Sequence, residues 1–404
     1  MPARLPPMKI ALLCSGLGHV FRGHEVFARG LFDMLQDRVD ITLLKGGGEP
    51  LPREQVVPNV PRNDPRLADI HVSVSPKWAE SVREQERLRI EHETFAYAAI
   101  GPLLAGDYDV VHCLEQEVCN IVHDNRHLFA RMPRLLFSNG GAIPAQDLPR
   151  CDFVQEHTAH NLKFSARDKA FMIPHGVDTQ RFRPGLPSDF RARHGIPADA
   201  FVMISVGTVC YHHKRMDHVI REVAAVPGAW LVIVGQENQD TPAIQALGRE
   251  LMGDRIVFTK LPHDELPLAY AAADAFVLGS LFETFGIVYI EAMAMGLPVF
   301  STHHVNQQSI VQEGVFVDMA KAGALTAAIR GTPREQLAEL GRRGRAIAVA
   351  QYDLELLKQQ YVQRYQAIAA APVQLPRYTW KSKLVANARN AVRMSVQRLH
   401  GRAQ

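Results

Sequence analysis

Short apolar runs recur along the chain, and each is followed by a turn and then by a segment with helical spacing. In the first part of the chain the runs are KIALLCS (9–15), VDITLLK (39–45), DVVHCL (109–114) and RLLFSNG (134–140). Such runs are typical of parallel strands that are buried on both faces. Their alternation with helices predicts a doubly wound α/β layer.

An irregular stretch marked by proline and glycine (170–187) interrupts the series, which then begins again. The later runs are FVMISVG (201–207), AWLVIVG (229–235), RIVFTK (255–260), AFVLGS (275–280) and LPVFST (297–302). We therefore predict an α/β protein with two Rossmann-like parallel-sheet domains that face a central cleft and are joined near 175–190. The length of 404 residues agrees, because it exceeds what one core usually serves.

The stretch SLFETFGIVYIEAMAMGLPV (280–299) keeps two acids, Glu283 and Glu291, in largely apolar surroundings. The pattern predicts a strand up to Ser280, a turn, and a buried helix that begins near Gly286. Ligands bind at this edge of an open α/β sheet, and a helix start suits a phosphate. A buried carboxylate needs an Arg or Lys partner or a ligand's hydroxyl groups, so a structural salt bridge and a binding role are both open for Glu291.

Composition and charge name no partner. The chain is 47% hydrophobic and 22% charged, with 45 basic and 42 acidic side chains, which is typical of a soluble globular protein. We expect no nucleic-acid partner. The start of the chain suits a first buried strand better than a signal peptide, and every apolar run is too short to span a bilayer, so we expect a cytoplasmic protein.

Metal and redox motifs are absent from the sequence. The five cysteines show neither zinc-ribbon nor CxxC spacing, and reduced thiols are the simplest interpretation. The histidine pairs 212–213 and 303–304 do not stand at i,i+4 spacing, and there is no HExxH pattern. We therefore predict no metal site.

The acidic stretch resembles the signature of the retaining GT-B glycosyltransferases of family four (glycosyl transferases group 1), in which E-x-F-G begins a motif of two glutamates separated by seven residues. The resemblance implies that Glu283 contacts the donor sugar, that Phe285 and Gly286, next to Thr284, approach the diphosphate, and that Glu291 binds the ribose. It also implies that the nucleotide base is read near Lys260 and Leu261.

The resemblance extends over most of the second domain. HGVDTQRFRP (175–184) resembles the interdomain segment, VGTVCYHHKRMDHVI (206–220) the phosphate loop, and QYDLELLKQQYVQRYQAI (351–368) the closing helix. In the phosphate loop Lys214 matches the family's lysine, whereas Thr208 occupies the place of an arginine and Arg215 that of a glycine. We hypothesise that Arg215 or a rearranged loop supplies the missing charge, and we assign catalysis to Glu283, Lys214 and Arg215.

The first domain matches less closely. The segment 15–35 resembles the family's glycine-rich loop and first helix, and Gly23 matches a position of its G-G-x-E pattern. Gly16 and Gly18 begin a dinucleotide fingerprint, but Phe21 stands where its third glycine is needed, so NAD is disfavoured and we expect no cofactor.

The acceptor side is less defined. His112 matches the first of two functional histidines in many relatives, but Leu114 stands at the second. Packing at a strand end and a functional role are both open for His112. Glu115, Glu117 and the turn SNGG (138–141), with Asn139, are further acceptor candidates.

These resemblances imply an acceptor-binding domain at 1–180, a nucleotide-sugar-binding domain at 181–352, a closing helix at 353–376 that returns to the first domain, and a basic tail at 377–404. The implied reaction is a metal-independent, retaining transfer from a nucleotide-diphosphate sugar to a hydroxyl of a glycan, glycolipid or small molecule. The alternatives are a sugar-nucleotide-binding protein that has lost turnover, because of Thr208 and Leu114, and a nucleotide-sugar epimerase.

The tail 377–404 carries seven Lys or Arg and no acid. Its apolar residues recur at three- and four-residue spacing. It is open whether this is a basic amphipathic helix on the inner face of an anionic membrane, which would suit a lipid-linked acceptor, or a packed or solvated segment.

Overall fold

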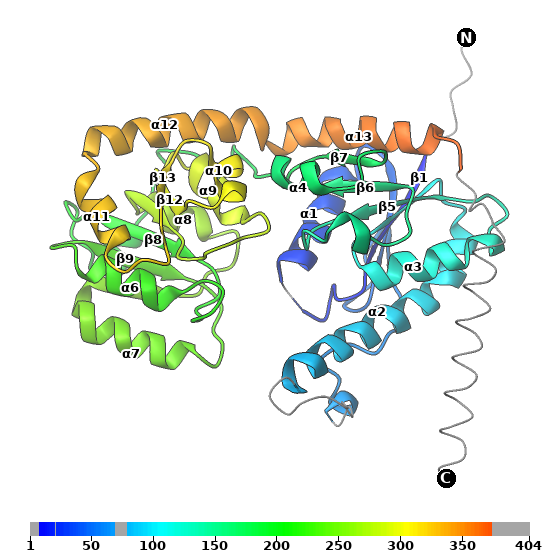
Figure 1. Cartoon of the computed structure of the whole chain (residues 1–404), viewed down its shortest axis with the longest axis horizontal. Coiled ribbons are helices and arrows are strands. Elements are labelled where there is room, and N and C mark those ends of the chain that lie inside the picture. The colour runs from blue at the N-terminus through cyan, green and yellow to red at the C-terminus, as the bar shows by residue number, and fades with distance from the viewer. Residues whose placement is uncertain (1–7, 21, 69–78, 374–404) are drawn as a thin grey trace. The chain divides into compact units, whose positions relative to one another are not determined.

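The computed structural model describes residues 8–20, 22–68 and 79–373 (Figure 1). The sequence-predicted tail 377–404 lies outside the described residues. Within them, no helix combines the length and the apolar character needed to cross a membrane.

The first sheet has seven parallel strands in the order β3-β2-β1-β4-β5-β6-β7. Their bounds are β1 Lys9–Cys14, β2 Asp40–Lys45, β3 Glu54–Val56, β4 Val110–Cys113, β5 Arg134–Ser138, β6 Phe153–Glu156 and β7 Ala170–Met172. The chain order reverses between β1 and β4, and ligands bind beyond the carboxyl ends of the strands at such a point.

Helices cover both faces of this sheet. They are α1 Gly23–Leu35, α2 Ala79–Gly106, α3 Gln116–Asp124 and α4 Ala159–Phe164, together with α13 Leu354–Ala370 from the far end of the unit. Side chains of α1 and α13 pack in one core with β1, β2 and β4, whereas α2 and α3 pack in a second core on the other face.

The second sheet has six parallel strands in the order β10-β9-β8-β11-β12-β13. Their bounds are β8 Val202–Val206, β9 Trp230–Val234, β10 Ile256–Thr259, β11 Ala275–Val277, β12 Val299–Thr302 and β13 Val315–Val317. The remaining helices are α5 Phe190–Arg193, α6 Met216–Ala224, α7 Thr241–Met252, α8 Leu266–Ala271, α9 Ile287–Ala294, α10 Val305–Val311, α11 Ala324–Gly331 and α12 Arg334–Gln351.

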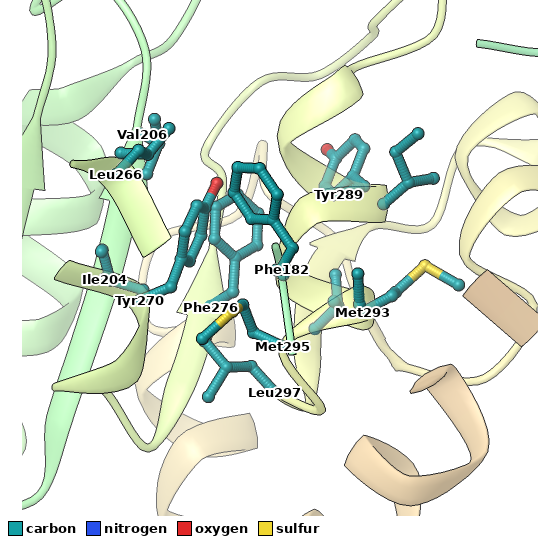
Figure 2. Packing of buried hydrophobic residues seen from close by; sticks show 14 of the residues in the cluster. Phe182, Ile204, Val206, Leu266, Tyr270, Phe276, Tyr289, Met293, Met295 and Leu297 are labelled. Atoms are coloured by element: carbon teal, nitrogen blue, oxygen red, sulfur yellow. The ribbon is translucent and has the colours of Figure 1, made fainter. Parts of the chain in front are cut away.

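One core of this sheet is built around aromatic rings (Figure 2). Tyr270 of α8 and Tyr289 of α9 lie on either side of Phe276 of β11, at centroid distances of 6.2 and 5.8 Å. Phe182, from the segment that joins the sheets, packs against Tyr270 in the same core. The helix that carries the acidic motif is therefore anchored in the interior, as its apolar sequence predicts.

The two-sheet α/β fold is confirmed, and each predicted strand is present, shortened by one to three residues. Four short strands (β3, β6, β7 and β13) and the long helix α2 were not predicted from the sequence.

Candidate active site

In the turn after β11, one carboxylate oxygen of Glu283 accepts hydrogen bonds from two polar side chains. Lys214 Nζ and Ser280 Oγ each donate a hydrogen bond of 2.6 Å to Glu283 Oε1. Glu283 is only 4% exposed, so its charge is compensated by the lysine within a largely dry site. Lys214 comes from the loop between β8 and α6, 69 residues earlier in the chain.

Two glycines let this loop approach the turn. A Cβ at Gly207 would lie 3.0 Å from Lys214 Cε, and Gly207 has a φ of +149°. A Cβ at Gly279 would lie 3.1 Å from the Lys214 carbonyl oxygen. The lysine stem therefore lies directly against Gly207, and the lysine backbone lies against Gly279.

Helix α9 begins directly behind the turn. Gly286, at its N-cap, has a left-handed φ of +82°, a conformation that favours glycine. Phe285 is 3% exposed, and its ring packs against the ring of His175 in the joining segment, with the two ring centroids 4.8 Å apart. Thr284 is half-buried between Glu283 and Phe285. The first amides of α9 thus follow the Glu283 turn without a break, and such amides can bind an anion.

Side chains of α10 hold the turn from behind. Asn306 Nδ2 donates to the carbonyl oxygens of Glu283 (2.8 Å) and Thr284 (3.0 Å), and Gln307 Nε2 donates to the Glu283 carbonyl at 2.7 Å. Both amide side chains are completely buried. These two residues were not predicted from the sequence, because an amide side chain that binds a distant carbonyl leaves no spacing pattern.

The second acid, Glu291, is 3% exposed and begins the second half of the buried helix α9. Tyr270 donates its hydroxyl to Oε2 at 3.0 Å, and His263 Nε2 lies 3.0 Å from Oε1. Burial, together with the charge of Glu291, raises the pKa of Tyr270, so this residue stays a hydroxyl donor. Within the described residues Glu291 shows no Lys or Arg ion pair, so the salt-bridge alternative is not what holds it. The side chain of His263 is largely exposed, so Glu291 Oε1 lies next to a group that contacts solvent.

The remaining donor-side candidates have different settings. Arg215 has a left-handed φ of +48°, and its guanidinium donates to the carbonyl oxygens of Gly279 and Met319. It therefore braces the turn, and the hypothesis that it faces a phosphate would require these bonds to break. Thr208 is exposed in the same loop, and Lys260 (exposed) with Leu261 (half-buried) follows β10.

His112 of the first sheet lies in the interior. It is fully buried, with Nδ1 2.7 Å from the Tyr365 hydroxyl of α13 and Nε2 2.7 Å from Ser138 Oγ. Burial lowers the pKa of His112 to about 3, so the ring is neutral. This placement favours the packing role, since both ring nitrogens are engaged by Tyr365 and Ser138.

The glycine-rich loop packs against its surroundings. A Cβ at Gly16 would lie 2.4 Å from Glu25 Oε1, and a Cβ at Gly18 would lie 2.1 Å from the Gly47 carbonyl oxygen. Gly23 is exposed at the start of α1. Asn139 closes its own turn, exchanging hydrogen bonds with the backbone of Ile143.

Glu115 lies at the carboxyl edge of the first sheet. Its Oε1 accepts hydrogen bonds from Ser15 N (2.9 Å) and Ser15 Oγ (3.1 Å), and His24 Nε2 lies 3.3 Å away. Burial opposes charge on His24, but the hydrogen bond and the negative charge of Glu115 outweigh it and raise the pKa of His24. Beside them Arg62 binds Glu25 and Glu91, a network that the sequence analysis did not anticipate.

Comparison with known proteins finds a family similarity in the part of the chain that forms the second sheet. Residues 188–340 match the family model of the glycosyl transferases group 1. A D-inositol 3-phosphate glycosyltransferase of Catenulispora acidiphila is 30% identical over 249 residues, 52% of this chain and 59% of the relative. The lipopolysaccharide core biosynthesis glycosyltransferase LpsE of Rhizobium meliloti is 31% identical over 182 residues, 43% of this chain and 52% of the relative. The chain thus spans between half and three fifths of the length of these curated relatives.

Solved structures share the fold over most of both chains. A sucrose-phosphate synthase from Thermosynechococcus elongatus has a TM-score of 0.72 at 21% identity, covering 90% of this chain and 100% of its own. Anabaena HepE in complex with UDP-glucose has a TM-score of 0.68 at 16% identity, covering 89% and 100%. The two parallel sheets thus form the GT-B fold, and residues 188–340 are similar to the glycosyl transferases group 1.

Proposed function

We propose that the protein transfers a glycosyl unit from a nucleotide-diphosphate sugar to an acceptor hydroxyl, with retention at the anomeric carbon. The contact between Lys214 and Glu283 carries this proposal. It joins the phosphate loop to the acidic motif at the carboxyl edge of a parallel sheet, where open α/β folds bind ligands.

The main catalytic requirement of this reaction is stabilisation of the negative charge that develops on the departing diphosphate. Lys214 supplies a positive charge, and the start of α9 at Gly286 supplies backbone amides, both fixed before the substrate binds. Glu283 orients the donor sugar, and its ion pair with Lys214 also holds the lysine in position. The leaving phosphate takes the acceptor's proton, and the charge of Lys214 serves in place of a divalent metal.

Glu291 would hold the ribose hydroxyls of the donor. A ribose would exchange hydrogen bonds with Oε1 in place of the exposed His263, while Tyr270 keeps Oε2 in position. Two of the similar solved structures contain UDP-glucose or UDP-2-fluoro glucose, which makes a UDP-sugar the first donor to test. The curated relatives are named for inositol phosphate and for lipopolysaccharide core, which favours a polyhydroxylated acceptor.

The test is thermal unfolding of the full chain with UDP-, GDP- and ADP-glucose, followed by release of the nucleoside diphosphate without acceptor. A ligand at about 100 times its Kd stabilises the folded state by about 2.7 kcal/mol. We expect one donor to raise the unfolding temperature and to be hydrolysed slowly, also with a chelator present. Lys214→Ala should abolish the hydrolysis, whereas the exposed Lys163→Ala should not.

The other outcomes decide between the alternatives. Binding without hydrolysis would support a protein that has lost turnover, an alternative that the exposed Thr208 in the place of an arginine favours. Release of a free epimer would support an epimerase. If no nucleotide sugar shifts the unfolding temperature, the proposed function is wrong.

A further inference from the structure

Three side chains with metal-binding atoms converge at the carboxyl edge of the first sheet. Cys14 is the last residue of β1, His24 lies in the first turn of α1, and Glu115 follows β4. One thiol sulfur, one imidazole nitrogen and one carboxylate oxygen lie within 4.8 Å of one another. The sequence could not show this cluster, because His24 and Glu115 are 91 residues apart.

One carboxylate oxygen of Glu115 is buried without a hydrogen-bond partner among the described residues. Its Oε1 accepts from Ser15 and is paired with His24, but the buried Oε2 has no hydrogen-bond partner within the described part of the chain. Leaving a buried carboxylate oxygen unpaired costs free energy, and Glu115 is 5% exposed. A cation at this position would remove that cost.

The surrounding charge also favours a cation. Glu25, Glu91 and Glu115 are each at most 5% exposed, and in the described ranges the arginine beside them is Arg62, which binds Glu25 at 3.2 Å and Glu91 at 2.5 Å. Arg62 and a protonated His24 together carry two positive charges against three carboxylates, so the cluster keeps a net negative charge. His24, whose side chain is 34% exposed, is the member through which solvent and an ion reach the cluster.

We propose that Cys14, His24 and Glu115 bind one zinc-like transition-metal ion. A thiolate, an imidazole and a carboxylate are donors that Zn²⁺ accepts, whereas Mg²⁺ and Ca²⁺ take oxygen ligands. Cys14 loses its thiol proton to solvent when the metal–sulfur bond forms, and His24 binds as the neutral ring. Three protein ligands leave the fourth tetrahedral position to a water molecule.

The proposal does not depend on the transfer reaction. Its ligands stand on β1, α1 and the end of β4, whereas Lys214 and Glu283 belong to the second sheet. The experiment therefore measures the metal itself.

The full chain is freed of metal with a chelator, kept reduced with a phosphine, and titrated with Co²⁺. We expect one equivalent to bind with a thiolate-to-cobalt charge-transfer band and intense tetrahedral d–d bands. Cys14→Ser should remove the charge-transfer band, and Glu115→Gln should weaken Co²⁺ binding at least about tenfold. The matched thiol control, Cys119→Ser, should leave both bands unchanged.

Folding is checked by circular dichroism and by unfolding of each variant without metal. Zn²⁺ should raise the unfolding temperature of the parent chain and not that of Cys14→Ser, because an ion stabilises only a state that binds it. The proposal is overturned if no charge-transfer band forms, if the band survives Cys14→Ser, or if Cys119→Ser removes it.

Discussion

At the scale of single residues, the two acids of the motif differ in what holds them. Glu283 is bound by a lysine and a serine, whereas Glu291 is bound by a tyrosine and an exposed histidine. We predict that Glu283→Gln lowers turnover about 10²- to 10³-fold with little change in nucleotide affinity, because it disturbs the ion pair at the reacting end. Steady-state kinetics and nucleotide titration measure the two effects separately.

Glu291→Gln should show the reverse pattern. Removing a charged hydrogen bond to the ribose should weaken nucleotide binding by about 1.5–3 kcal/mol, or roughly 10- to 150-fold, with a smaller effect on turnover at saturation. Glu339→Gln, at a half-exposed carboxylate of α12 that is paired with Arg343, is the matched control. Equal losses in both variants would contradict the separate roles.

His112 makes stability depend on pH. The Ser138 hydroxyl donates to Gln155, so it accepts from His112 Nε2–H, and Nδ1 in turn accepts from the Tyr365 hydroxyl. This arrangement requires a neutral ring, which agrees with a pKa lowered by burial to about 3. The unfolded chain binds the proton near pH 6.5. Between these values the unfolded state holds more protons, so stability falls as pH falls.

We predict that His112→Gln lowers the free energy of unfolding at pH 7 and makes it less sensitive to acid. The slope between pH 6 and 4 should decrease by up to about 1.4 kcal/mol per pH unit, the value for one proton. Urea unfolding at several pH values measures this slope, and the exposed His127→Ala should leave it unchanged. An unaltered slope in His112→Gln would show that other groups carry the acid sensitivity.

At the scale of elements, the sequence predicted those whose apolar pattern is unbroken. It missed β6, whose Gln155 and Glu156 are polar but completely buried, and it missed three-residue strands such as β13. In β6 the hydrogen bonds of Gln155 to Ile173 and Tyr361 replace apolar packing. Such partners come from distant segments, which a local pattern does not contain. For the same reason Lys214 and Glu283 could be predicted from a resemblance to a family, whereas the side-chain amides of α10 that hold the Glu283 turn could not.

Helix α10 should control activity through Asn306 without contacting the substrate. Asn306→Ala removes the donors to the Glu283 and Thr284 carbonyls, and we predict a loss of turnover of about 10- to 100-fold through misplacement of the turn. Nucleotide affinity should change much less, because Glu291 keeps its own partners. Kinetics and nucleotide titration of the folded variant measure both.

Asn306→Asp separates positioning from packing. The aspartate has the same shape but places negative oxygen against two carbonyl oxygens, so it should not restore the activity lost in Asn306→Ala. The exposed Gln308→Ala on the same helix should behave as the parent chain. Full activity of Asn306→Asp would show that the hydrogen bonds from Asn306 to the two carbonyl oxygens do not position the turn.

At the scale of the whole molecule, helix α13, which follows the second sheet in the chain, packs in the core of the first sheet. Leu357, Tyr361, Tyr365 and Ile368 of α13 are at most 3% exposed and belong to the core of β1, β2 and β4. Burying each such side chain stabilises by about 1.5–3 kcal/mol, so together they contribute roughly 6–12 kcal/mol. That equals the whole stability of a typical domain, about 5–15 kcal/mol.

We therefore predict that residues 1–173 do not fold alone but fold when a flexible linker joins them to 353–373. The second fragment, 174–352, contains its own sheet together with Phe182 and should unfold cooperatively without help. Urea unfolding followed by circular dichroism measures each fragment. In the joined fragment, Leu357→Asp with Ile368→Asp removes the apolar contacts and should abolish cooperative unfolding, which a non-specific effect of the linker would not do. Cooperative unfolding of 1–173 with the same free energy as the joined fragment would show that α13 is dispensable to the first sheet.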